Sequence, residues 1–428
     1  MLEAAIMQPG VTAAAVGGSA NAGLSAHVRM GQVETIEFFR DKSLGITVYK
    51  GQRSGSATIT DLTQPAITAA ITAACRIAEY TEPDVYSGLA DKADLATDIK
   101  DLDLYHVSNI TPEQAIAKAL ECEAAALNYD KQITNSDGAA FSTSDQLYVY
   151  ANSNGFLAAY PTTRYGAYCT VIGQQGESMQ RDYEYTAARD AADLMSLQEL
   201  GKKAAAKTMA RLGARKIKTC KAPVLLVPKT ASTLWGTLVT AISGGNLYRK
   251  SSFLLDCLQQ QIFPDFVNIS EQPYLLKALG SAPFDDEGVA TCTKDVIKDG
   301  VLATYLLGSY AARHLGMRTT GNAGGVHNLV VQPGTDNFEQ LLQKMGTGFV
   351  VTELLGHGTN IITGDYSQGA AGFWVENGAI AYPVEEVTIA GNFKDIFANL
   401  VATGNDIDAR SNIITGSVLL EQLTVAGS

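Results

Sequence analysis

The order of the hydrophobic periodicities is the feature that most constrains the fold of this chain. Near the N-terminus, apolar and polar residues alternate with a period of two, which is typical of β-strands. These runs are 23–30, 32–40, 46–50 and 56–60, and we expect turns between them at 30–31, 41–43 and 51–53. Helical periodicity follows at 64–80 and again after residue 111, and strand patterns return at 133–185. Because strands and helices are grouped and do not alternate regularly, the pattern favours an α+β fold over a parallel βαβ fold.

Capping and turn residues indicate where these elements begin and end. The second helix is expected to start at Thr111-Pro-Glu-Gln114, where Thr111 and Gln114 form a capping box, and to reach about residue 128. The strand region contains three hairpin signals, at 136–138, 152–155 and 174–176. A long helical pattern at 186–213 either continues or breaks near Ser196, which forms a second capping box with Glu199, and it stops at Gly213.

The second half is rich in glycine and in short strands. It opens with an apolar strand at 222–227 and a helix at 231–242, followed by a hairpin at 298–300 and a short helix at 310–315. Glycine-studded strands begin at Gly321, and Glu376-Asn377-Gly378 is a hairpin signal. We therefore expect two domains. They are an N-terminal antiparallel sheet with long helices (1–218) and a β-rich, barrel-like domain with short helices (219–428).

Composition excludes several classes of function. The 428 residues are 46% hydrophobic and 18% charged, which is typical of a globular protein. Net charge is −12, and both halves are acidic, with 18 Lys+Arg against 25 Asp+Glu in 1–215 and 14 against 19 in 216–428. A nucleic-acid partner would require a basic stripe, so we expect none.

The first residues, the apolar runs and the cysteines bear on the cellular location of the chain. The start, MLEAAIMQPG, lacks the basic and apolar regions of a signal peptide, and no apolar run is long enough to span a membrane. The six cysteines contain no CxxC pair and are interpreted as reduced structural thiols. These observations predict a cytoplasmic protein without a membrane partner.

Local motifs give little catalytic chemistry. No two of the five histidines lie within four residues of each other, so a helical HExxH zinc motif is absent. GxSxG and GxxxxGK[ST] are absent too, and no GxGxxG follows a strand. His357, between two glycines, is the histidine best placed for a ligand, with a structural or interface role as the alternative. The acidic runs 285–287 and 385–386 could bind a cation, but they are interpreted as solvated loop charge. On local chemistry alone the chain is a binding or scaffold protein.

Longer stretches carry a specific resemblance. In the second half they include NLYRKSSFLLD (246–256), SAPFDDEGV (281–289), KDGVL (298–302), GNAGGVHN (321–328), MGTGFVVTELLGHGTN (345–360), GDYSQGAAGFWVENGAIAYPV (364–384), IAGNFKDIF (389–397) and GNDIDARSNIITGSVLL (404–420). In the first half they include VRMGQVETIE (28–37) and RDYEYTAARDAADL (181–194). Together they closely resemble the PmbA (TldE) branch of the TldD/PmbA metallopeptidase family, over essentially the whole chain.

The resemblance implies a cytosolic two-domain protein that forms a heterodimer with a TldD-type subunit. That complex is a zinc-dependent peptidase acting on unfolded peptides, linked to microcin maturation and antitoxin degradation. An older label for the family, modulator of DNA gyrase, describes a phenotype, and the acidic charge of this chain agrees with an indirect effect.

The chain departs from the family at the zinc motif. TldD-type chains have HExxxH on a helix that resembles 231–242 here, and ungapped alignment places Gly236, Thr237 and Ala241 at the His, Glu and His positions. None of the three can bind zinc or act as a general base. The family's later thiolate ligand is also missing, since no cysteine follows Cys292. We therefore expect no cofactor in this chain, zinc in the TldD-type partner, and no catalysis by this chain alone.

Three functional hypotheses remain. In the first, the glycine-rich strands around 356–372 line a chamber and present edge backbone to an extended peptide. Its candidate peptide-binding or interface residues are Gly356, His357, Gly358, Asp365, Tyr366, Ser367 and Trp374. In the second, the chain is a homodimeric peptide-binding or chaperone-like protein. In the third, it is an autonomous hydrolase that uses His314, His327 or His357.

Overall fold

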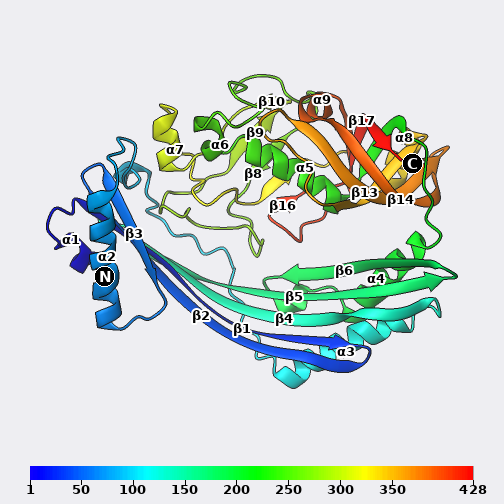
Figure 1. The fold of residues 1–428 in the computed structure, drawn as a ribbon, viewed down its shortest axis with the longest axis horizontal. Coiled ribbons are helices and arrows are strands. Elements are labelled where there is room, and N and C mark those ends of the chain that lie inside the picture. Colours follow the sequence, from blue (N-terminus) through cyan, green and yellow to red (C-terminus); the bar gives the residue numbers. More distant parts are fainter. Residues whose placement is uncertain (428) are drawn as a thin grey trace.

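The computed structural model describes residues 1–427, and its first half is one long antiparallel sheet. The strands are β1 (Ala13–Arg29), β2 (Gln32–Lys50), β3 (Arg53–Ile59), β4 (Ile133–Asn152), β5 (Leu157–Gln175) and β6 (Ser178–Ala188). Their order in the sheet is β3-β2-β1-β4-β5-β6. The sheet curves like an open half-barrel, and the second half of the chain lies on its concave side (Figure 1).

These strands are longer than the sequence pattern predicts. The turn expected at 41–43 is wrong, because β2 continues through it and pairs Lys42 with Ala20 and Ser43 with Ser19. The hairpin expected at 136–138 is wrong as well: β4 continues there through a bulge between Ser136 and Gly138. A bulge bends a strand without ending it, which suits a curved sheet. The hairpins at 152–155 and 174–176 are confirmed as the β4–β5 and β5–β6 turns.

Helices pack on the face of this sheet opposite the second half of the chain. They are α1 (Leu2–Ile6), α2 (Gln64–Tyr80), α3 (Pro112–Leu127) and α4 (Leu197–Arg211), with the 3-10 turn η2 (Ala191–Asp193) beside them. A second 3-10 turn, η1 (Lys92–Asp94), instead contacts the second half of the chain, where the Ala290 N–H donates to the Asp94 carbonyl. Small buried residues such as Ala119 and Ala204 let α3 and α4 pack closely on β4 and β5. The capping box at Thr111 is confirmed, and the Ser196 hydroxyl caps α4 by accepting from the Glu199 N–H. The helical pattern expected at 186–213 is wrong at its start, since 186–188 belong to β6, and the helix begins only after Ser196.

The second half contains a closed ring of five strands. They are β7 (Cys220–Leu226), β12 (Gly348–Leu355), β13 (Asp365–Glu376), β14 (Ala379–Asn392) and β17 (Val418–Ala426). The pairing runs β14-β13-β12-β7-β17, and β17 pairs again with β14, which closes the barrel. The β7–β12 pair is parallel and the other four are antiparallel. A sixth strand, β15 (Leu400–Thr403), extends from β17.

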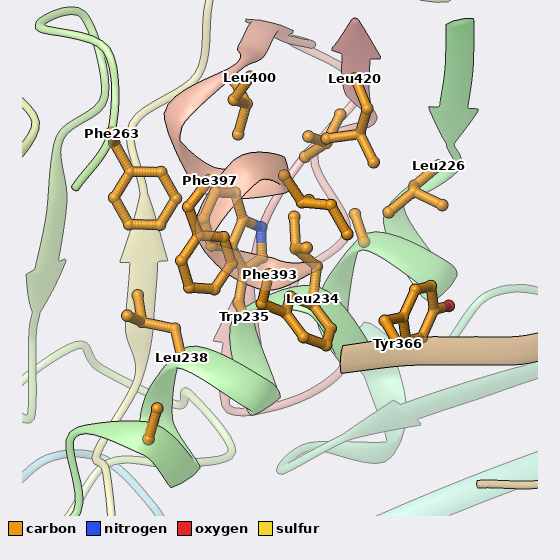
Figure 2. Close-up of a cluster of buried hydrophobic side chains, with 14 of the residues drawn as sticks. Leu226, Leu234, Trp235, Leu238, Phe263, Tyr366, Phe393, Phe397, Leu400 and Leu420 are labelled. Carbon is orange, nitrogen blue, oxygen red and sulfur yellow. The ribbon is translucent and has the colours of Figure 1, made fainter. Parts of the chain in front are cut away.

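Alternation along the ring strands supplies two apolar surfaces. On β7, Val224 and Leu226 belong to the largest hydrophobic core, together with α5 (Pro228–Ala241) and α9 (Phe393–Ala398). Leu225, between them, packs on the other side against α8 (Phe338–Met345). Figure 2 shows the larger core, in which Trp235 of α5 lies close to Phe263 and to Phe397 of α9. The ring is therefore held between helices packed on both of its surfaces.

A smaller five-stranded sheet completes the second half. It has the order β10-β9-β8-β11-β16. Its elements are β8 (Ile269–Glu271), β9 (Lys294–Lys298), β10 (Val301–Leu302), β11 (Leu329–Val331) and β16 (Ile413–Ile414), accompanied by α6 (Gly244–Tyr248) and α7 (Ser309–His314). The hairpin predicted at 298–300 is confirmed between β9 and β10, and the short helix expected at 310–315 is confirmed as α7.

The two halves pack together through the concave face of the first sheet. The buried Phe284 contacts the ring of Tyr160 on β5, with a centroid distance of 5.3 Å. It also contacts the ring of Phe156, just before β5, with a centroid distance of 5.1 Å. The expectation that 285–287 form solvated loop charge is wrong for Asp285, which is 1% exposed. Its carboxylate accepts hydrogen bonds from three backbone N–H groups, because a buried carboxylate needs such partners. The α+β fold class is confirmed, and within 1–427 no helix combines the length and apolar character needed to cross a membrane.

Candidate functional site

A cleft of about 440 Å³ lies beside α5, at one end of the ring. Its floor is apolar and comes from α5, α9 and the ring strands, while its rim is formed by the β12–β13 loop. The lining residues are Leu226, Thr233, Leu234, Thr237, Leu354, Gly356, His357, Gly358, Thr359, Tyr366, Gln368, Ile389, Phe393, Ile396, Leu420 and Leu423. Figure 2 shows several of them, with Leu234, Phe393 and Tyr366 close together. Sites for small or extended ligands have this composition, apolar with a few polar groups.

Helix α5 carries the three positions at which the family resemblance led us to expect HExxxH. Thr237 lines the cleft, and its hydroxyl donates to the Thr233 carbonyl oxygen at 3.1 Å. Gly236 is partly exposed, and the nearest atom to a Cβ added there is Ile413 Cδ1 at 3.9 Å. Ala241 has no exposed surface and belongs to the main core. Only one of the three positions therefore reaches the cleft.

The β12–β13 loop is held against the start of β13 by backbone contacts. The Ser367 N–H donates to the Gly358 carbonyl at 2.8 Å, and the Gln368 side chain donates to the Gly356 carbonyl at 2.7 Å. A Cβ at Gly358 would lie 2.0 Å from the Ser367 carbonyl oxygen, so this close approach requires glycine. His357, between the two glycines, is exposed on the rim.

The other predicted residues on β13 have different surroundings. Tyr366 is 9% exposed, its ring lies 5.0 Å from that of Phe393, and burial raises the pKa of its hydroxyl. Asp365 is exposed and lies outside the cleft. Hydrogen bonds from Thr363 and Asn392 lower the pKa of Asp365 and hold the loop to β14. Ser367 is exposed, and its side chain is not part of the cleft lining.

Trp374 lies away from this group. It is eight residues beyond Tyr366 on β13, a distance of about 26 Å along an extended strand. There it pairs with Phe349 of β12 and Tyr382 of β14 and packs half-buried on the main core. The structure thus brings together Gly356, His357, Gly358 and Tyr366 with Thr237, and it separates Trp374 from them.

The expectation of free strand edge around 356–372 is wrong for β13. From Asp365 to Glu376 this strand pairs with β14, and from Gly369 to Val375 it also pairs with β12, so ring closure uses both of its edges. The free edge lies instead on β12. Its pairing with β7 ends at Val351, while Leu354 and Leu355 pair with β13 alone. Leu354 lines the cleft, so this short edge borders the same cavity.

The side chains around α5 do not fit a zinc ion. A catalytic zinc site needs three nitrogen, sulfur or carboxylate ligands, and the aligned positions offer one hydroxyl that is already hydrogen-bonded to the helix backbone. Throughout residues 1–427, no group of three His, Cys, Asp or Glu side chains has a metal-binding arrangement.

The histidines of the third hypothesis lie in separate environments. His314 stacks against Tyr248 with a centroid distance of 4.5 Å and also contacts Tyr86. His327 lines a different cavity, where burial lowers its pKa. His357 is on the rim of the α5 cleft. The structure therefore does not bring them into one site.

Several lining residues were not predicted from the sequence. Leu234 lies three residues before Thr237 and so shares its face of α5, a spacing that was available in the sequence. Phe393 and Ile396 come from α9, which was not predicted, and they reach the cleft because the ring places β14 and α9 beside α5. No local signal indicated that arrangement.

Three family models together match most of the chain. The models of the PmbA/TldA metallopeptidase domain 1, central domain and C-terminal domain match residues 14–78, 105–212 and 219–427. The chain belongs to the PmbA/TldA metallopeptidase family. It is 51% identical to metalloprotease PmbA of Escherichia coli O157:H7 over 96% of this chain and 91% of that protein. It is 47% identical to a PmbA homologue of Haemophilus influenzae over 95% of this chain and 90% of that protein.

Solved structures in the family share the fold. A Bacteroides thetaiotaomicron protein, described as a candidate modulator of DNA gyrase, superposes with a TM-score of 0.94 at 28% identity, over 100% of this chain and 97% of that one. TldE from Thermococcus kodakarensis has a TM-score of 0.85 at 20% identity, over 97% of each chain, which supports the fold alone. This PmbA/TldA chain therefore belongs to a family of proteins named metalloproteases, which supports a peptidase-related role.

Proposed function

We propose that this chain is the non-metal-binding subunit of a zinc metallopeptidase of the PmbA/TldA family and binds an extended peptide in the cleft beside α5. One observation carries the proposal. The cleft is well formed and apolar, but the α5 positions that align with the zinc motif are Gly236, Thr237 and Ala241. A site that keeps its shape without ligands or a general base is suited to binding and not to hydrolysis.

The free edge of β12 supplies backbone hydrogen bonds to the peptide. Leu354 and Leu355 pair with β13 on one side, so a peptide strand can add on the other. One of its side chains then enters the cleft and contacts Leu234, Phe393 and Ile396. Backbone pairing with one apolar contact gives little sequence selectivity, as is needed for unfolded peptides of varied sequence.

The catalytic zinc comes from a TldD-type subunit in a heterodimer. Zinc-dependent hydrolysis of a peptide bond needs a metal-bound water and a general base. The three α5 positions supply neither ligands for the metal nor a carboxylate that could act as the base. In this arrangement the present chain contributes peptide binding and the partner contributes chemistry.

A homodimeric peptide-binding protein is the second candidate, and the N-terminal half of β2 favours it. β3 pairs with β2 only from Leu44 to Lys50, so residues 32–43 form an edge of the sheet. Phe38 on this edge is 70% exposed and Ile36 is 42% exposed. Long edges with apolar side chains pair readily with another chain, and a second copy would supply one.

The test measures cleavage of an unfolded peptide by this chain alone, by the cognate TldD-type chain alone, and by the two co-purified, with zinc content determined for each. We expect activity and stoichiometric zinc only when the TldD-type chain is present, and higher activity in the complex. Zinc-dependent cleavage by this chain alone would refute the proposal.

A variant pair locates the binding step in the cleft. Thr237→Trp fills the cleft from α5 and should raise the KM of the complex without changing its zinc content. Thr240→Trp is the matched control, because Thr240 is exposed on the same helix and does not line the cleft. An unchanged KM for the first variant would place the peptide elsewhere.

A further inference from the structure

A second cavity, of about 590 Å³, lies between the concave face of the first sheet and the loops of the second half. Its lower wall consists of residues that alternate along the strands and so share one face: Tyr148 on β4, and Tyr160, Thr162 and Arg164 on β5. Its upper wall comes from the segments 279–286, 324–327 and 410–412. It is separate from the α5 cleft and is lined mostly by polar groups.

Two arginines without an acidic partner mark one end of this cavity. The β5–β6 register pairs Tyr165 with Ala188, which places Arg164 opposite Arg189 one residue further along. Within residues 1–427, neither arginine has a carboxylate within 4.0 Å. Like charges directly opposite each other on a sheet are unfavourable. The chain has a net charge of −12, yet none of its described carboxylates pairs with these two arginines. We therefore expect the arginine pair to bind an anion that is not part of the chain.

Arg189 is held rigidly and retains a free donor. Its two terminal nitrogens donate to the carbonyls of Thr163 at 3.1 Å and Leu279 at 2.7 Å. Its Nε is buried and has no hydrogen-bond partner in the described part of the chain. His327 also lines the cavity, and among the described residues its buried Nε2 likewise has no hydrogen-bond partner. Neither atom is open to solvent, so neither contacts a ligand in the cavity directly. A guanidinium has five N–H donors, and the two bonds to Thr163 and Leu279 leave the terminal nitrogens of Arg189 with further N–H groups for a ligand.

The other end of the cavity is acidic. Asp286 lies 3.5 Å from the Tyr148 hydroxyl and, among the residues described, has no basic side chain within 4.0 Å. Gly324 makes room for it, since a Cβ there would lie 2.3 Å from a carboxylate oxygen of Asp286. A third arginine, Arg410, is already neutralised by Asp408 and Glu184. The cavity is therefore cationic at one end and anionic at the other.

The separation of the two ends indicates the size of the ligand. Tyr148 and Tyr160 are direct partners across β4 and β5, and Arg164 lies four residues beyond Tyr160. Four strand residues span about 13 Å, which is the length of about four residues of extended peptide. A polyanion such as a nucleotide would be repelled by Asp286, whereas a zwitterion matches both ends.

We propose that this cavity binds a short peptide of three or four residues with both termini free, its carboxylate on Arg164 and Arg189 and its ammonium group on Asp286. The inference rests on the proposed function, since it specifies a second peptide site in the same subunit, sized for a cleavage product. Arginine is suited to this role because its planar fork matches a carboxylate. The rings of Tyr148 and Tyr160, which both contact Phe284, form the floor.

Calorimetric titration of the full chain, without any partner, tests the inference. The probes are tetra-alanine with free termini, the same peptide with a C-terminal amide, the same peptide with an N-terminal acetyl group, and inorganic phosphate. We expect the free peptide to bind at least about tenfold more tightly than either blocked form, because each blocked end loses a charge-assisted hydrogen bond. Phosphate should bind more weakly than the free peptide.

Three variants assign the two ends. Arg164→Gln, at an exposed position, should remove the preference for a free carboxylate while retaining the preference for a free amino group. Asp286→Asn should do the reverse. Arg181→Gln is the matched control, because Arg181 is an exposed arginine of the same sheet outside the cavity.

Absence of binding, equal binding of free and amidated peptides, equal or tighter binding of phosphate, or an effect of Arg181→Gln equal to that of Arg164→Gln would each overturn the inference. Any of these outcomes can occur whether or not the proposed function is correct. That proposal is tested by partner-dependent cleavage, whereas this titration involves neither a partner nor catalysis.

Discussion

The guanidinium of Arg211, at the end of α4, donates a 2.5 Å hydrogen bond to the carboxylate of Glu353 on β12. Arg211 also lies 3.4 Å from Asp182 on β6, and its side chain is 11% exposed. One side chain thus joins the half-barrel and its helices to the closed ring. Glu353 is next to Leu354 of the α5 cleft, so this contact positions the edge to which we assign the peptide.

Replacing Arg211 should uncouple the two halves. Arg211→Gln leaves Glu353 and Asp182 without their cation and should lower the free energy of unfolding by about 1–3 kcal/mol. Urea denaturation followed by circular dichroism measures the change. Lys203→Gln is the control, because its pair with Glu199 is exposed and should contribute less than about 0.5 kcal/mol. Equal effects of the two variants would contradict the assignment.

The stability of the protein should depend on the ionisation of Asp285. Burial raises the pKa of Asp285 to about 7, against about 3.9 for an unfolded aspartate. Because the pKa of Asp285 is higher in the folded state, the folded protein binds this proton more tightly than the unfolded chain does. The resulting stabilisation of the folded state is complete below about pH 4 and is lost as the pH rises to about 7. The contribution is on the order of 4 kcal/mol.

Comparison with Asp285→Asn isolates this effect. The stability advantage of the unchanged chain over the variant should shrink between pH 5 and pH 8, as measured by urea denaturation at each pH. Asp98→Asn provides the control, because the Asp98 side chain is 78% exposed. Its substitution should change the free energy of unfolding by the same amount at pH 5 and at pH 8. An advantage that grows with pH would mean that the three backbone N–H donors outweigh burial.

The loop around His357 should be essential for peptide binding. Gly358→Ala places a Cβ 2.0 Å from the Ser367 carbonyl and must displace the loop from β13. We expect a rise of at least about tenfold in the KM of the complex, which corresponds to about 1.4 kcal/mol of lost binding. Gly245→Ala, at an open position in α6, should leave KM unchanged. Equal KM values for the two variants would remove this loop from the binding site.

Restoring the histidines of the zinc motif should affect stability unequally. Gly236→His should be tolerated, because a Cβ at that position meets no atom closer than 3.9 Å. Ala241→His forces an imidazole into the main core and should lower the free energy of unfolding by about 1–3 kcal/mol or more. Thermal unfolding of each single variant checks this. Equal melting temperatures would show that α5 can rotate to accommodate the second histidine.

Local signals predicted α2 and α3 but missed α8 and α9, although both of these have a side-chain cap. α2 occupies the predicted range 64–80, and the capping box at Thr111 gave the start of α3 because the motif satisfies N–H groups that every helix leaves unpaired. Long curved strands were less predictable. Asp41-Lys42-Ser43 has the composition of a turn, but its backbone is paired along β1, and pairing with a distant strand outweighs local preference.

The candidate site was predictable only in part. The resemblance to the TldD/PmbA family pointed to α5 and to residues 356–358, and the structure brings Thr237, His357 and Gly358 into one cleft. Asp365 and Ser367 lie on the strand next to the cleft without lining it. Phe393 and Ile396 could not be assigned, because their place follows from pairings between strands far apart in the sequence.

The closed ring also has a consequence for biosynthesis. Its first strand, β7, begins at Cys220, whereas β17, which lies between β7 and β14, ends at Ala426. Until β17 has left the ribosome, β7 lacks one neighbour and the ring stays open with unpaired strand edges. The first half can fold before that point, but the ring cannot close, and such non-local pairing is slow. Nascent chains stalled before β17 is synthesised should therefore depend on chaperones far more than chains that contain it.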